Sequence, residues 1–171
     1  MERWRLSGFA VLAALIGLLA VGVSSAASTS ISSVVITGTQ AKPVITIKGT
    51  GFGSQPGTNP TYHPPALTHR LCPVKPVAPL AQYGWDYGTH LYLTDGSRHP
   101  GWSAGRYRPA LGELDCIGLL ISKYTPTEIV FRLGAAYPTT PGTPAHYALA
   151  TGDRFTVGVN GVVFSGVVRY R

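Results

Sequence analysis

The fold is decided by the stretch Arg154-Phe-Thr-Val-Gly-Val-Asn-Gly-Val-Val-Phe-Ser-Gly-Val167, near the end of the chain. Both halves of this stretch are rich in Val, Phe and Thr, the residue types that favour β-strands. Between the halves stands Asn160-Gly161, the dipeptide preferred in two-residue hairpin turns, where both central residues need a positive φ. The stretch therefore predicts two antiparallel strands, and Phe155 and Val157 share one face of the first strand.

Further short runs rich in Val, Ile, Thr, Tyr and Phe precede this hairpin, separated by Gly and Pro, and no run keeps a helical period. Ile45 and Ile47 alternate with polar neighbours, which indicates a strand with one face on a core. The almost continuous apolar run around Leu119 predicts a central strand that is covered on both sides. Strands are predicted at residues 31–37, 43–48, 90–93, 116–122, 128–133, 154–159 and 162–170.

The predicted strands are short and joined by turn signals, a pattern typical of an all-β, two-sheet β-sandwich of the immunoglobulin type. Two connections are long: the proline-rich residues 54–88 and the Pro- and Gly-rich residues 137–152. Long loops inside a compact domain are usually functional or mobile. We therefore expect about seven strands in one domain, residues 28–171, with functional residues on its loops.

The first residues have the parts of an export signal. Arg3 and Arg5 precede an apolar run at 9–23, and small residues follow at 24–28. A membrane anchor is the alternative, but the run is shorter than the roughly 20 residues that span a bilayer. We expect a signal peptide at residues 1–27, cleaved after Ala26 or Ala27, and a secreted, extracellular domain with no stable membrane insertion.

The two cysteines, Cys72 and Cys116, both lie in the part of the chain that would be exported. Two cysteines in an oxidising compartment are expected to pair, so we predict a Cys72–Cys116 disulfide bond. The alternative is a pair of buried free thiols.

The net charge of +7 suggests attraction to an anionic partner. However, the basic residues are scattered singly and form no run. This distribution argues against a nucleic-acid partner and favours loose attraction to an anionic cell envelope.

The segment Val44-Ile-Thr-Ile-Lys-Gly-Thr-Gly-Phe-Gly53 resembles the strand-and-turn signature of IPT/TIG domains, which are immunoglobulin-like modules. Gly51 and Gly53 allow backbone angles that a side chain would forbid, while Phe52 can enter the core and fix the turn. Residues 124–131 and 153–170 fit the family more loosely, and the long insertion at 54–88 departs from it. The resemblance implies a binding or spacer role and carries over no catalytic residue.

Aromatic residues crowd the predicted loops, and flat rings can cover the apolar face of a sugar. The alternative is that Trp85 and Trp102 close the ends of the sandwich and hold the long loops in place. The candidate binding residues are the aromatics Trp85, Tyr87, Trp102 and Tyr107, with charge supplied by Arg106 and Arg108.

No group of residues rises to a catalytic signature. Asp95, His99 and Ser103 contain the residue types of a hydrolase triad, but no Gly-x-Ser-x-Gly motif surrounds the serine. The histidines lack the spacing of a zinc site, so we expect no metal. We also expect no cofactor and no catalytic residue. The predicted function is a secreted, non-catalytic binding module for polysaccharide or a cell-envelope component. The alternative is a structural or protein-interaction domain whose strand edges pair with another chain.

Overall fold

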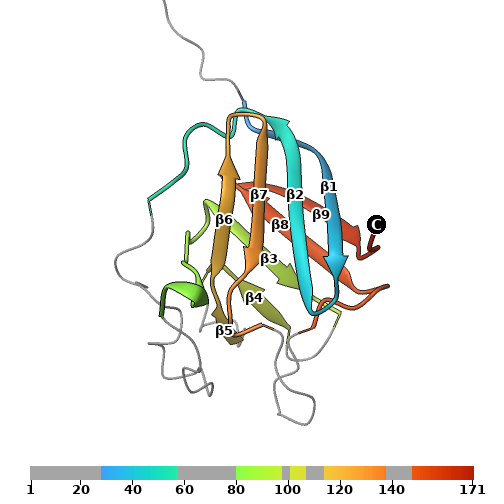
Figure 1. The fold of residues 1–171 in the computed structure, drawn as a ribbon. Coiled ribbons are helices and arrows are strands. Elements are labelled where there is room, and N and C mark those ends of the chain that lie inside the picture. Colours follow the sequence, from blue (N-terminus) through green and yellow to red (C-terminus); the bar gives the residue numbers. More distant parts are fainter. Residues whose placement is uncertain (1–27, 58–79, 98–100, 107–113, 138–147) are drawn as a thin grey trace, which may run out of the picture.

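The computed structural model describes residues 28–57, 80–97, 101–106, 114–137 and 148–171. These residues form two β-sheets that stack face to face, with a core of buried aliphatic and aromatic side chains between them (Figure 1). The predicted all-β, two-sheet sandwich is therefore confirmed.

Each of the two sheets combines strands from separate parts of the chain. The first sheet has the order β1 (Ser30–Thr39), β2 (Lys42–Thr50), β7 (Glu128–Leu133) and β6 (Leu119–Tyr124). The second has the order β5 (Leu114–Ile117), β4 (Trp102–Ala104), β3 (Leu91–Asp95), β8 (Arg154–Val159) and β9 (Val162–Val167). All neighbours pair antiparallel except β4 and β5, which are parallel.

This order matches immunoglobulin topology. Numbered along the chain, β1, β2, β7 and β6 take the places of strands A, B, E and D, while β4, β3, β8 and β9 take those of C′, C, F and G. Strand β5 is an addition at the edge of the second sheet. A parallel bridge between Ile36 and Tyr170 joins the edge of the first sheet to the chain that follows β9, so one corner of the sandwich is closed.

The predicted central strand at 116–122 is wrong. The chain breaks at Gly118 into the end of β5 and the start of β6, which are edge strands of different sheets. Ile117 and Leu119 are both fully buried, because the chain crosses the sandwich interior between them. The crossing explains the continuous apolar run. The short strand β4 was not predicted, while the other predicted strands coincide with β1, β2, β3, β7, β8 and β9.

The two turns predicted from the sequence, at residues 160–161 and 51–53, form as expected. Asn160 and Gly161 have φ values of 48° and 84°, so the β8–β9 hairpin has positive φ at both central residues. Phe52 is buried between two glycines that also have positive φ. Its N–H donates a 3.1 Å hydrogen bond to the carbonyl of Pro126, which fixes the end of β2 against the turn before β7.

Several predictions lie outside the described residues. They concern the signal peptide at 1–27 and the residues Cys72, Tyr107 and Arg108. Cys116 belongs to β5, but its side chain is not described, so the disulfide bond stays a prediction. In the part of the chain that the structure describes, no helix is long and apolar enough to cross a membrane.

Candidate functional site: a cationic cleft on the four-stranded sheet

Of the three described aromatic residues that were predicted to bind a ligand, two lie in the core. Trp102 is 1% exposed and Tyr87 is 3% exposed. The indole N–H of Trp102 donates a 3.2 Å hydrogen bond to the Asp95 carboxylate. Trp85 is partly buried, and its backbone N–H and C=O both bond to Leu119, with distances of 3.1 and 2.9 Å. Trp102 and Tyr87 are therefore core residues, whereas Trp85 retains some exposure beside them.

Arg106, the charged residue predicted beside these aromatics, is also buried, at 7% exposure. Its guanidinium carbon lies 3.7 Å from the centre of the Tyr92 ring, and Nη2 donates a 2.9 Å hydrogen bond to the Thr94 hydroxyl. The Tyr92 ring in turn covers Gly158, where an added Cβ would come within 2.2 Å of the ring. Arg106 therefore holds Tyr92 against the five-stranded sheet through a cation–π contact.

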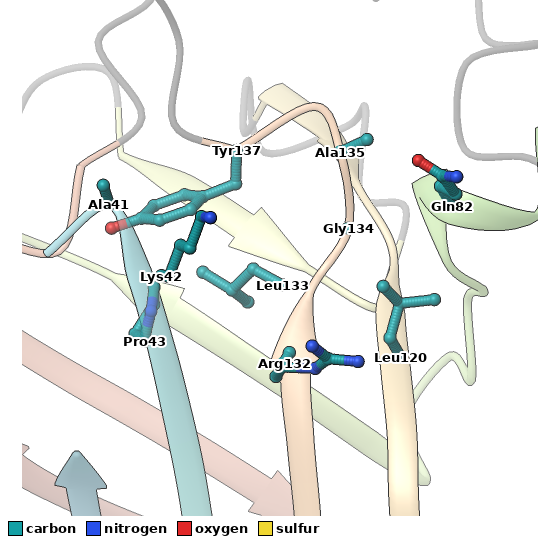
Figure 2. Close-up of a pocket in the computed structure, with 10 residues that line it drawn as sticks. All are labelled: Ala41, Lys42, Pro43, Gln82, Leu120, Arg132, Leu133, Gly134, Ala135 and Tyr137. Atoms are coloured by element: carbon teal, nitrogen blue, oxygen red, sulfur yellow. The ribbon is translucent and has the colours of Figure 1, made fainter. Parts of the chain in front are cut away.

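A cleft of about 540 Å³ opens at one end of the four-stranded sheet (Figure 2). Its volume lies in the range of small-ligand sites. The described residues that line it come from the turn before β2, the starts of β2 and β6, the end of β7, the turn after β7 and the short 3₁₀ helix η3 (Leu80–Tyr83). They are Ala41, Lys42, Pro43, Gln82, Leu120, Arg132, Leu133, Gly134, Ala135 and Tyr137.

Strand register places two cations side by side in this cleft. Arg132 is the Cα partner of both Val44 and Leu120, so its side chain shares their outward face. Lys42 precedes Val44 by two residues and lies on the same face. Such diagonal neighbours on adjacent strands are about 7–8 Å apart. Lys42 and Arg132 are both exposed, and in Figure 2 the Lys42 side chain extends toward Tyr137 while the guanidinium of Arg132 extends toward Leu120.

The wall that carries Gln82 is fixed by backbone contacts. The Gln82 carbonyl accepts a 2.8 Å hydrogen bond from the N–H of Ala135, and the Tyr83 carbonyl accepts one of 3.1 Å from Gly118. This close approach requires glycine at position 134, because a Cβ there would lie 1.8 Å from the Tyr83 carbonyl oxygen. The helix η3 therefore sits directly on the end of β7, and the position of Gln82 is set by the backbone.

Tyr137 forms the opposite wall. Its hydroxyl donates a 2.7 Å hydrogen bond to the carbonyl of Gln40 and accepts one of 2.9 Å from the N–H of Leu149. Its ring packs against Trp102, with 5.7 Å between ring centres. Burial raises the pKa of Tyr137 above its ordinary value, so the hydroxyl stays neutral at physiological pH. Tyr137 is therefore a fixed wall that joins the cleft to the core.

The chemistry of the described lining residues is that of a binding site. They supply two cations, one amide, apolar carbons and the engaged Tyr137 hydroxyl, and they include no carboxylate, imidazole or thiol. The buried acids Asp86 and Asp95 are not among them. Ser103 is fully buried, and His99 lies outside the described residues. Within the described ranges, no three His, Cys, Asp or Glu residues gather as a metal site.

Sequence reasoning missed this cleft because its residues are separated by up to 96 positions, from Ala41 to Tyr137. The signal that was present is an outward cation near the relevant end of each of two strands, Lys42 beside Pro43 and Arg132 between Phe131 and Leu133. Only strand pairing brings the two together.

Fold and site together define an immunoglobulin-like β-sandwich with a cationic cleft on its four-stranded sheet. Comparison of the chain with family models, with curated proteins and with solved structures finds no match.

Proposed function

We propose that this domain is a secreted, non-catalytic binding module that holds a polysaccharide or another cell-envelope component in the cleft. The observation that supports the proposal is the composition of the cleft: apolar carbons of Leu120 and Leu133 beside hydrogen-bond donors on Gln82, Lys42 and Arg132. A sugar ring has an apolar face and a rim of hydroxyl groups, so it needs both kinds of contact.

The cleft is also built on rigid elements. Its cations project from paired strands, and Gln82 is fixed by the backbone bond to Ala135. A preorganised site loses little conformational entropy when a ligand binds. We further propose that the domain is a decorated IPT/TIG-like module, a class that would suit a binding role; the buried Phe52 between positive-φ glycines supports this assignment.

A cleft-filling substitution tests the proposed function. Ala135→Trp places an indole in the cleft, whereas Ala81→Trp adds the same side chain at an exposed position of η3 that is not among the described lining residues. The purified domain is applied to an array of cell-wall polysaccharides, and melting temperatures are recorded. We expect Ala135→Trp to lose binding while Ala81→Trp retains it. Equal binding by both variants would refute the cleft as the site.

A second candidate function, protein interaction through a strand edge, is favoured by strand β9. Val163 and Val167 are 55% and 49% exposed, and β9 contains no charged residue and no proline. The pairing of β8 with β9 is regular, whereas the edge strands β1 and β6 are interrupted by bulges. Edges that lack bulges, charges and prolines are prone to pair with other strands.

Self-association measured by light scattering over a concentration series tests this second candidate. A concentration-dependent dimer that Val163→Lys disrupts and Ser33→Lys, a matched change on edge strand β1, leaves intact would support it. A monomer at every concentration would count against self-pairing of β9.

A further inference from the structure

We infer that the ligand of the cleft is an acidic saccharide, whose carboxylate binds between Lys42 and Arg132. The inference rests on the proposed function and specifies its ligand class. Its starting point is that two cations from neighbouring strands, Lys42 and Arg132, line the same cleft.

Neither cation is neutralised by the residues that the structure describes. Lys42 and Arg132 form no side-chain hydrogen bond or ion pair with the described residues. The one ion pair found there on the outer face of this sheet, Lys123–Glu128, lies at the other end of β7. A pair of cations that share a cleft without an acid is a site that an anion would stabilise.

The arginine at position 132 favours an anionic group that presents two oxygen acceptors. The guanidinium of Arg132 presents paired N–H donors that match a carboxylate or a phosphate in a bidentate manner. Lys42 supplies a point charge from the adjacent strand, and Gln82 supplies amide groups to hydroxyls nearby. Opposite charges in such contacts make short, strong hydrogen bonds.

The rest of the cleft is larger and more apolar than a free inorganic anion needs. Leu120, Leu133 and Pro43 lie beside the cations, and the volume of about 540 Å³ leaves room for more than one ring. The charged group is therefore attached to a body with an apolar face. A sugar acid has both features on one residue.

The test compares two forms of one polymer fragment by isothermal titration calorimetry. An oligomer of α-1,4-linked galacturonic acid carries the carboxylates, and its fully methyl-esterified form has the same backbone without charge. Inorganic phosphate and a glycerol phosphate oligomer are titrated in parallel to distinguish a phosphate source. Each titration is run at low and at physiological salt, because screening weakens exposed charge pairs.

Matched variants assign the effect to the two cations. We expect Lys42→Gln and Arg132→Gln each to weaken binding of the acidic oligomer about tenfold, as for the loss of one charge-assisted hydrogen bond. Lys48→Gln lies on the same face of β2, about 20 Å away along the strand, and should change nothing, as should Arg154→Gln on the other sheet. Arg132→Lys retains the charge and should recover part of the affinity.

The outcomes separate this inference from the proposed function. Binding of the acid form with loss on esterification supports the inference. Equal binding of both forms overturns it and leaves a glycan-binding function in place. Binding of the phosphate oligomer but neither saccharide overturns the ligand class. Binding of no oligomer overturns the inference, and the polysaccharide array then decides the proposed function separately.

Discussion

The side-chain amide of Asn160 donates a 3.1 Å hydrogen bond to the backbone carbonyl of Phe52, 108 residues earlier in the chain. The Tyr124 hydroxyl donates to the same carbonyl at 3.2 Å. Phe52 follows β2 of the first sheet by two residues, and Asn160 lies in the β8–β9 hairpin turn of the second. This contact therefore joins the two sheets at one end of the sandwich.

Substitutions at Asn160 separate its two roles, which are the positive φ and the cross-sheet bond. Asn160→Gly preserves the turn and removes the cross-sheet bond together with the exposed 3.2 Å hydrogen bond between the Asn160 and His90 side chains, so we expect the free energy of unfolding to fall by about 1 kcal/mol. Asn160→Ala also strains the turn and should cost about 2 kcal/mol in total. Urea unfolding followed by tryptophan fluorescence measures both. Wild-type stability in Asn160→Gly would show that the bond contributes nothing.

Adding a methyl group at Gly134 should damage both stability and the cleft. The new Cβ would collide with the Tyr83 carbonyl, a backbone atom, and push η3 away from β7. We expect Gly134→Ala to lower the free energy of unfolding by about 2–4 kcal/mol and to weaken ligand binding by displacing Gln82. The control is Gly96→Ala, where a Cβ meets no atom within 4 Å. Equal stability of the two variants in urea unfolding would contradict this packing account.

The sequence was sufficient to predict most strands, because their signals are local. Ile45 and Ile47 alternate with polar residues, and Asn160-Gly161 marks its hairpin without help from distant residues. The same local reasoning failed where burial comes from tertiary structure. Gly118 breaks the apolar run because the chain packs against Gly84, where a Cβ added at 118 would lie 2.3 Å from the Gly84 carbonyl carbon.

The candidate site was not predictable from local pattern. Trp102 sits in a strand of three residues between Gly101 and Gly105, too short for an alternation to be visible, so it was assigned to a loop. The cations of the cleft are 90 residues apart and become neighbours only through the pairing of β2 with β7. The residue types suggested a binding surface of aromatic and charged side chains. Which of these side chains are exposed to solvent depends on how the strands pair.

Trp102 should behave as a core residue. Trp102→Ala removes a buried indole that packs on Tyr137 and bonds to Asp95, and we expect it to cost about 3–5 kcal/mol. Trp102→Phe preserves most of the packing and should cost less. The exposed Val163→Ala is the control and should change stability by less than about 0.5 kcal/mol. A Trp102→Ala variant with native stability would restore the interpretation of Trp102 as a surface binding residue.

Two buried acids should make the protein more stable at low pH than at neutral pH. Burial raises the pKa of Asp86 from its ordinary 3.8 to about 7. Burial also raises the pKa of Asp95, although the hydrogen bond from Ser97 opposes the change. The folded state therefore retains protons that the unfolded chain has already lost. This stabilisation is complete below the unfolded pKa and is lost as the pH rises toward about 7.

The pKa of Glu128 is shifted in the opposite direction, so Glu128 serves as an internal control. The hydrogen bond from Lys123 lowers its pKa, so its contribution to stability is present above its unfolded pKa and is lost as the pH falls. Urea unfolding between pH 4 and pH 8 should show stability falling with pH in the wild type. Asp86→Asn, which stays neutral at every pH, should flatten this decline. Glu128→Gln should leave the decline in place, because the exposed pair contributes little. A decline that Asp86→Asn does not reduce would show that Asp86 is ionised in the folded protein at low pH.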